Sequence, residues 1–482
     1  MKKYFLINIV LMVLIGCSVG PDYTRPTVTV PSDFKELKGW REAQPRDQEI
    51  RTKWWEVFDD PILNTLIEQV NVSNQSIALS ESQYRQALAQ VQLLRANYFP
   101  TLGAGASFTR TNNAASTNIT ENQHQVSLSA SWELDVWGKV RRQVEAGRAT
   151  AEASFADLQA MRLSMQAELA SDYFQLRTLD AQKKTLDDSV AAYRKALELT
   201  QNRYNASVAA KADVVAAQTQ LETTKAQAID VGVQRAQYEH AIAVLMGKPP
   251  ADFSLAPSEF KLPPIKIPVA VPSDLLERRP DIASAERQMA AANAQIGVAK
   301  AAYYPTLTLA GSLGYLSTEL ANLFTSPNYF WALGPMTASA TLFDAGARQA
   351  QTKQAMAAYD GTVASYRQTV LTGFQEVEDY LAALRILDDE AQIQDQAVND
   401  ARESVILTTN QYKAGLVSYL NVVTVQTTAL ANEKTAIGIS GQRLNAAVLL
   451  VKALGGGWVS AVNQKIIRDK SGRIIWEENS DD

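Results

Sequence analysis

The stretch "QVSLSASWELDVWGKV", residues 125–140, changes its periodicity at a single glycine, Gly138. Before Gly138, apolar and polar residues alternate, as they do in a β-strand with one apolar face and one wet face. Farther along the chain, apolar residues recur every three or four positions, which is the period of a helix. The fold is therefore expected to join strands directly to helices. The polar members of the alternation are Ser127, Ser129, Ser131, Glu133 and Asp135.

Three more segments alternate in the same way, within 101–111, 307–315 and 336–342. Strands of roughly ten residues have the length of a tilted membrane crossing. In that interpretation the polar face lines a water-filled lumen and the apolar face contacts lipid. A soluble antiparallel sheet with one dry face explains the alternation equally well when it is considered alone. The residues expected to face lipid include Trp132, Leu134, Leu307 and Leu309.

Two very long helices are predicted after Gly138 and Gly346, at 139–205 and 347–413, each 67 residues long. Their apolar spacing averages about 3.5 residues, the period of left-handed coiled coils. At 1.5 Å per residue, each would extend about 100 Å. Each helix then turns and returns as a shorter helix that ends at a glycine. The turns are expected at 206–212 and 414–420, and the returning helices at 212–247 and 420–455.

The two halves of the chain repeat each other. "NRYNASVAAKADVVAAQT" (202–219) aligns with "NQYKAGLVSYLNVVTVQT" (410–427) at an offset of 208, and the same offset pairs Gly138 with Gly346. Two copies of one structural unit are therefore expected. Eight of the 17 prolines fall in 249–280, which indicates an extended connector between the copies. The predicted segments are 17–72 (N-terminal equatorial), 73–247 (repeat 1), 248–280 (connector), 281–457 (repeat 2) and 458–482 (C-terminal equatorial tail).

The N-terminus resembles a bacterial export signal. Lys2 and Lys3 precede an apolar run, and Leu14-Ile15-Gly16-Cys17 matches a lipobox, so residues 1–16 are predicted to be a lipoprotein signal peptide. Cys17, the only cysteine, is then expected to carry diacylglycerol and N-palmitoyl groups. A plain export signal with an incidental cysteine is the alternative. Ser18 follows instead of the aspartate that retains lipoproteins at the inner membrane, which favours the outer membrane.

Composition argues against several functions. A formal net charge of −5 makes a nucleic-acid partner unexpected. One cysteine and two histidines cannot form a Cys/His metal cluster, and neither a GxSxG nor a P-loop motif is present. Glu133 and Asp135 share one strand face and could act as paired catalytic carboxylates, but a solvated lumen wall explains them better. The chain is expected to be neither an enzyme nor a protein that needs a metal or another cofactor.

Four strands cannot close a membrane barrel, since the smallest known barrels have about eight. An open sheet in lipid would leave backbone groups at its edges unsatisfied. Three copies supply twelve strands in a closed ring, so a homotrimer is expected. The predicted fold class is mostly α with membrane β, a trimeric twelve-stranded barrel that continues into a coiled-coil cylinder of twelve helices.

Several motifs resemble the outer-membrane factor (TolC-like) family, and specifically its lipoprotein (NodT-type) branch. They are "VGPDYTRP" after Cys17, "WWEVFDDPILNTLIEQVNVSN" (54–74), "RRPDIASAERQMAAANAQIGVAKAAYYPTLTL" (278–309) and "KALGGGW" (452–458). The resemblance covers essentially the whole mature chain. It implies an outer-membrane channel that projects into the periplasm.

The same resemblance implies a passive exit duct for drugs or other small toxic compounds. The implied partners are a periplasmic adaptor protein, an inner-membrane transporter of the RND class and outer-membrane lipid. One alternative is an exit duct for a type I protein secretion system. Another is a lipid-anchored periplasmic scaffold without a pore, which would not need the alternating strands. The sequence does not identify the transported compound.

The resemblance also implies a gate at the two helix turns. In the family a tyrosine of the second turn donates a hydrogen bond to an aspartate of the first, and these positions match Tyr412 and Asp213. Leu416, Val417 and Leu420 are expected to narrow the opening with apolar side chains, which gate by dewetting. The alternative is that these residues only pack the turn.

Overall fold

The computed structural model describes residues 18–36, 53–112, 120–258 and 278–456, and the backbone of 464–468 and 474–478. The chain divides into two compact units. Unit 1 contains the N-terminal segment up to Val28 together with Ser82–Phe155 and Ser284–Gln368. Unit 2 contains the remaining described residues, among them both turns between the long helices and their returning partners.

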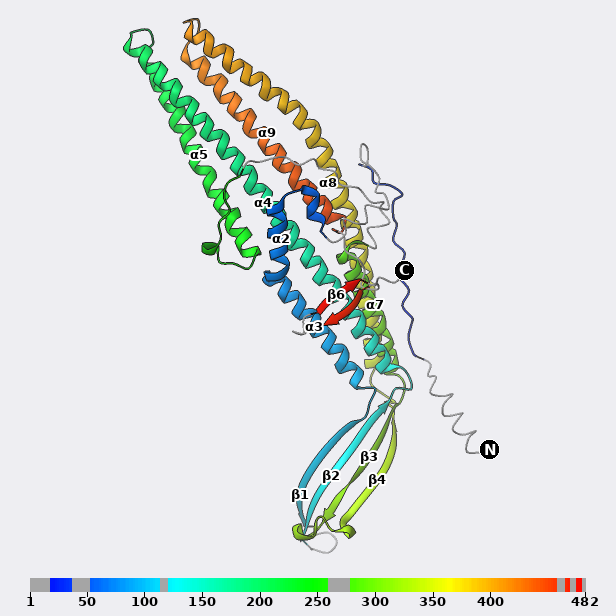
Figure 1. The fold of residues 1–482 in the computed structure, drawn as a ribbon. Helices are drawn as coiled ribbons and strands as arrows, with labels where there is room; N and C mark the ends of the chain where they lie inside the picture. The colour runs from blue at the N-terminus through cyan, green and yellow to red at the C-terminus, as the bar shows by residue number, and fades with distance from the viewer. Residues whose placement is uncertain are drawn as a thin grey trace. The chain divides into compact units, whose positions relative to one another are not determined.

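Unit 1 contains a four-stranded antiparallel sheet in the order β1-β2-β3-β4, so the chain adds its strands one after another (Figure 1). The two strands of each repeat pair with each other, and β2 pairs with β3 to join the repeats. Each strand is 11 to 15 residues long, which suits a tilted membrane crossing. The strands are β1 (Thr101–Asn112), β2 (Thr120–Leu134), β3 (Thr306–Ser317) and β4 (Tyr329–Ser339).

The sheet is shorter than the sequence predicted. Strands were expected within about 100–137 and 305–343, but β2 ends at Leu134 and β4 at Ser339. Residues beyond these ends turn toward the following helices, at positive-φ Gly138 and Gly346. Asp135 and Leu342 therefore lie outside the strands whose alternation they appeared to continue.

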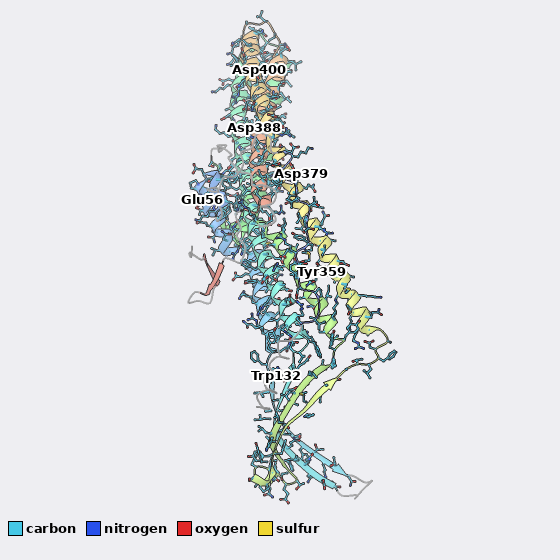
Figure 2. All side chains as sticks on the ribbon, turned by 90° about the vertical axis from the view of Figure 1, so that its right-hand side faces the viewer. Glu56, Trp132, Tyr359, Asp379, Asp388 and Asp400 are labelled. Atoms are coloured by element: carbon cyan, nitrogen blue, oxygen red, sulfur yellow. The ribbon has the colours of Figure 1, made fainter. Side chains whose placement is uncertain are left out.

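At the helix end of the sheet, aromatic contacts hold the two repeats together within unit 1. Trp137 precedes the long helix of repeat 1 and stacks on Tyr304, which precedes β3, with ring centroids 4.9 Å apart. The indole Nε1 of Trp137 also donates to the carbonyl oxygen of Pro305 at 2.8 Å. Figure 2 labels Trp132 at the same end of the sheet, where its Nε1 donates to the carbonyl oxygen of Tyr98 at 3.1 Å.

The long helices have the expected bounds. Helix α4 spans Lys139–Asn205 and α8 spans Ala347–Lys413, each with 67 residues. Their returning partners, α5 (Lys211–Leu245) and α9 (Tyr419–Ala453), have 35 residues each and begin one residue earlier than expected. Both end two residues early, because Gly247 and Gly455 adopt left-handed φ angles of 68° and 92° that close the last turn.

The shorter helices begin at recognisable signals. Asp60 accepts from the backbone N–H groups of Ile62 and Leu63, and Pro61 occupies the first helical position. Nearby in unit 2, Trp54, Trp55 and Phe58 are buried, and the Trp54 ring contacts both of the other rings. These helices are η2 (Trp54–Phe58), α2 (Pro61–Ser73), α3 (Gln75–Ala96), η3 (Pro250–Asp252), α7 (Pro280–Ala301), η4 (Leu320–Asn322) and η5 (Ser326–Asn328).

The N-terminal segment, which was expected to be equatorial, is divided between the two units. The N-terminal part up to Val28 groups with unit 1, whereas the following residues group with unit 2. Near the C-terminus, β5 (Gln464–Arg468) and β6 (Ile474–Glu478) pair antiparallel. Most of the proline-rich connector, 259–277, lies outside the described residues.

Candidate functional site

The register of the sheet places small and polar residues on one face. Ser127 pairs with Gly105 on one side and Gly314 on the other, and Ser129 pairs with Gly103 and Ser312. Ser131 lies between Thr101 and Ala310, and Glu133 lies opposite Thr308. Because paired residues point to the same side of an antiparallel sheet, these residues share one face across three strands.

The opposite face is apolar across all four strands. Leu128 pairs with Ala104 and Leu313, and Leu313 pairs in turn with Trp331. Trp132 pairs with Leu309. On this apolar face, Leu102 and Leu333 are 82% and 80% accessible in the isolated chain. The sheet therefore carries two chemically different faces, the arrangement required of a wall between lipid and water.

Close approach of the backbone explains one glycine of the small-residue face. A Cβ atom on Gly314 would lie 2.2 Å from the carbonyl oxygen of Val126 and 2.7 Å from the Cα of Ser127. No side chain larger than hydrogen fits there without moving β2 away from β3.

Asp135 does not continue the polar strand face as predicted. Its carboxylate accepts from the backbone N–H groups of Val140 at 2.8 Å and Arg141 at 2.9 Å, so it caps the start of α4. Asp344 caps α8 in the same way, accepting from Gly346 at 3.0 Å and Arg348 at 3.2 Å. The prediction that Asp135 belongs to the polar face of the strand is therefore wrong, because β2 ends at Leu134.

Glu133 lies at the last wet position of β2, where its carboxylate accepts from Lys139 Nζ at 3.1 Å. Both side chains are partly exposed, so the ion pair contributes little to stability. Within the described ranges, no three His, Cys, Asp or Glu side chains gather closely enough to hold a metal ion.

The two turns at the far ends of the helices form a compact cluster in unit 2. Tyr412 and Tyr419 are 4% and 2% exposed, and their rings meet edge to face with centroids 5.2 Å apart. Ala217 and Val422 complete the buried cluster, and Val417 packs against it. Val417 is thus a packing residue, whereas Leu416 and Leu420 are 75% and 64% exposed.

The expected hydrogen bond between Tyr412 and Asp213 is not formed. The Tyr412 hydroxyl oxygen is buried and has no hydrogen-bond partner among the described residues. The contact that does reach Tyr412 comes from the end of α4, where the guanidinium carbon of Arg203 lies 4.7 Å from the ring centroid. The family resemblance directed attention to Asp213, and Arg203 was missed. A comparison of the two repeats could have indicated Arg203, because the equivalent position of repeat 2 carries the uncharged Gln411.

The N-terminal segment forms a strap, defined here as residues 18–25, that docks within unit 1. Cys17 itself lies outside the described residues. Val19 donates its backbone N–H to the carbonyl oxygen of Trp137 at 3.1 Å. Ser18 lies close to Gly138, because a Cβ atom added to Gly138 would lie 2.9 Å from the Oγ of Ser18. The residue that follows the lipobox therefore lies at the junction between sheet and helix.

Buried charges hold the rest of the strap. Arg142, only 4% exposed, bonds to Asp22 at 2.7 Å. The hydroxyl of Tyr23 donates to Glu286 at 2.6 Å, and Arg287 donates to the same carboxylate. Burial opposes ionisation of Glu286, but these hydrogen bonds more than offset it, so its pKa lies below the usual range. These anchoring residues were not identified from the sequence.

No described helix combines the length and the apolar character needed to cross a bilayer.

Comparison with known proteins agrees with this geometry. The solved structure of the outer-membrane channel OprN superposes with a TM-score of 0.85 at 29% identity, covering 92% of this chain and 100% of that chain. The solvent efflux pump outer membrane protein SrpC of Pseudomonas putida is 31% identical over 480 residues, 96% of this chain and 100% of the relative. The probable outer membrane lipoprotein SilC of Salmonella typhimurium is 28% identical over 469 residues, 95% of this chain and 100% of the relative.

Paired long helices, an internal repeat and a two-faced sheet in the fold of OprN define an outer-membrane channel protein. The model of the outer membrane efflux protein family matches residues 66–248 and 271–456, and the chain belongs to that family. This confirms the expected fold class, the outer-membrane location and the role as the outer-membrane part of an efflux system.

Proposed function

We propose that three copies of this chain form a passive exit duct for small toxic compounds. The observation that carries the proposal is the sheet, whose order leaves β1 and β4 as its two edges in the described part of the chain. Such edges are not tolerated in lipid, so β4 of one copy pairs with β1 of the next until twelve strands close. The small-residue face then surrounds a water-filled lumen.

The long helices continue the duct into the periplasm. Helices α4 and α8, with α3 and α7 beside them, supply four helices per copy where they follow the sheet. Beyond α3 and α7, the returning helices α5 and α9 again make four. Twelve helices in both parts give a cylinder of constant helix number.

The proposed partners follow from the efflux role. A periplasmic adaptor protein docks on the helical cylinder, and an inner-membrane transporter of the RND class supplies the compounds and the energy. The relative SrpC is a solvent efflux pump outer membrane protein, which supports small molecules as cargo. Export of whole proteins by a type I secretion system remains the alternative, and export assays with the neighbouring pump genes distinguish the two.

Acylation of Cys17 supplies a second membrane attachment besides the strands of the barrel. A lipid anchor holds a protein stably when a second attachment acts with it. The docked strap supports this assignment. Ser18, the residue that follows Cys17 in the sequence, lies against Gly138, where the sheet meets the helices. Mass spectrometry of the mature protein is expected to find residue 17 at the N-terminus with three acyl chains, and an unmodified cysteine would contradict it.

The duct is tested by reconstituting the purified protein in planar bilayers. We expect a trimer whose electrophoretic mobility changes on heating, and discrete single-channel conductance. Arginine at Leu313, on the apolar face, should prevent assembly by costing about 2–4 kcal/mol near the bilayer midplane. The matched Ser312→Arg variant, on the other face, should assemble and alter conductance. The opposite pattern would reverse the proposed lumen and lipid faces, and a monomer without conductance would favour the scaffold.

A further inference from the structure

Arg203, two residues before the end of α4, reaches across to the other long helix. Its Nη1 donates to the carbonyl oxygen of Lys413, the last residue of α8, at 2.9 Å. The same guanidinium lies over the Tyr412 ring, 4.7 Å from its centroid. Figure 1 shows the two helix turns at the same end of the molecule. One side chain thus connects the hairpin α4–α5 to the hairpin α8–α9.

Both contacts suit a guanidinium. The last carbonyl groups of a helix have no partner within the helix, and the helix dipole places partial negative charge there. A planar guanidinium can donate to such a carbonyl while its face lies on an aromatic ring. A lysine would supply the charge but not the stacking plane.

The same cluster contains buried polar atoms without hydrogen-bond partners among the described residues. They are the hydroxyl oxygens of Tyr412 and Tyr419, Nε of Arg203 and Oε1 of Gln426. Burial raises the pKa of Tyr419 to about 12, and its protonated hydroxyl has no acceptor among the described residues. Unsatisfied buried polar atoms are costly, and water would satisfy them if the hairpins separated. The packed turns are therefore stabilised by the contacts of Arg203 and destabilised by the buried polar atoms that lack partners.

The attraction is one-sided. Gln411, which occupies the equivalent position in repeat 2, is exposed, and no reciprocal bond from it to the end of α4 is present in the described structure. Tyr204, the equivalent of Tyr412, is 39% exposed. Arg203 therefore supplies the polar link at the ends of α4 and α8, whereas the bonds from Tyr193 to Gln426 and from Thr427 to Gln220 join the hairpins farther from the turns.

We propose that Arg203 is the positioning residue that holds the two hairpins together at their turns, and that loss of its contacts with Lys413 and Tyr412 accompanies opening of the periplasmic end. This inference rests on the proposed duct function. The hydrogen bond expected between Tyr412 and Asp213 is replaced by two contacts of Arg203, one with the Tyr412 ring and one with the last carbonyl group of α8.

The test measures the open-to-closed ratio of the full-length trimer from single-channel records in planar bilayers. Arg203→Ala is expected to raise the open-to-closed ratio about tenfold, the effect of removing one partly desolvated cation–ring contact together with one charge-assisted bond. Arg203→Lys should give an intermediate rise. Gln411→Ala, at the equivalent position of the other repeat, is the matched control and should behave as wild type.

A second measurement keeps the result independent of conductance. Spin labels at Val208→Cys and Leu416→Cys, two exposed and equivalent turn positions, report the separation of the hairpins. The distance distribution should broaden in Arg203→Ala and stay unchanged in Gln411→Ala. Wild-type conductance with no change in either measurement for Arg203→Ala would overturn the inference and leave the duct intact. Absence of any wild-type conductance would instead overturn the proposed function.

Discussion

The two helix turns have the same backbone and different side chains. In the first, Ser207 N–H donates to the Tyr204 carbonyl at 2.8 Å, and in the second, Gly415 N–H donates to the Tyr412 carbonyl at 3.0 Å. Both central residues have left-handed φ angles, 60° and 78°. Yet Tyr204 is 39% exposed and Tyr412 is 4% exposed. Duplication has thus kept the turn geometry, while substitution has made the second turn the packed one.

The largest expected effect separates the two tyrosines. Tyr412→Ala removes a buried ring and the surface on which Arg203 lies, and should lower local stability by about 3 kcal/mol. Tyr204→Ala removes a ring that is partly in water and should cost less than about 1 kcal/mol. Hydrogen exchange at the ends of α8 and α9 measures the difference. Equal losses of protection would mean that the turns are packed alike.

The next effect concerns the left-handed residue of each turn. Ser207→Gly should stabilise the first turn by roughly 0.5–1 kcal/mol, because glycine adopts this φ angle without strain. Gly415→Ala should destabilise the second turn by about 1 kcal/mol. Thermal inactivation of the trimer measures both. Stability changes of the same sign in the two variants would show that the left-handed φ angle does not determine which residue is favoured at positions 207 and 415.

Acid pairs also differ between the repeats. Glu168 and Asp172 correspond to Glu376 and Tyr380, and Glu376 is bonded to Arg279 at 2.6 Å. Burial and the charge of Glu168 raise the pKa of Asp172 from 3.8 to about 6. The folded state therefore prefers protonated Asp172, so its contribution to stability is complete below pH 3.8 and is lost as the pH rises through 6.

Asp172→Asn should therefore stabilise the protein at neutral pH by about 1 kcal/mol, after allowance for solvent screening at a half-buried position. Denaturant unfolding of wild type and variant at pH 4 and pH 7 measures this. The gain should vanish at the lower pH. Tyr380→Phe is the matched control in repeat 2 and should show no pH dependence in this range.

The smallest effect is the sharpest test of the second turn. Tyr412→Phe keeps the ring under Arg203 and removes a buried hydroxyl that has no partner among the described residues, so stability should rise or stay within about 1 kcal/mol of wild type. Closed-state conductance should not increase. A clear increase would mean that the hydroxyl, bonded to Asp213 or another acceptor in the trimer, holds the duct closed.

Some elements were predictable because their signals are local. Gly138 and Gly346 mark where strands end and helices begin, and the sustained helical spacing predicted α4 and α8 at their observed bounds. The two faces of the sheet followed from alternation of period two, and the observed register keeps them consistent from β1 to β3, whereas a register shift between Leu309 and Gly311 interrupts the alternation where β3 pairs with β4.

Other features depend on contacts between distant residues, and no local pattern contains them. Arg203 and Lys413 are 210 positions apart, and Arg142 and Asp22 are 120 apart. Asp135 was misassigned for a different reason. Its place in the alternation matched a strand, but the capping of α4 used its carboxylate once the chain had left the sheet. Where a helix follows a strand directly, the cap overrides the alternation.

The equal lengths of the paired helices limit how this chain can gain or lose residues. Both outward helices have 67 residues and both returning helices have 35, and the bond from Arg203 to Lys413 joins their ends at one level. A one-residue insertion in α4 alone would shift its end by about 1.5 Å and rotate it by about 100°, turning the guanidinium away from α8. Only insertions of about seven residues, made in all four helices together, would preserve the facing stripes while lengthening the cylinder by about 10 Å. The length of the helical cylinder can therefore change only in steps of about seven residues per helix, and relatives with longer or shorter cylinders should differ by whole heptads.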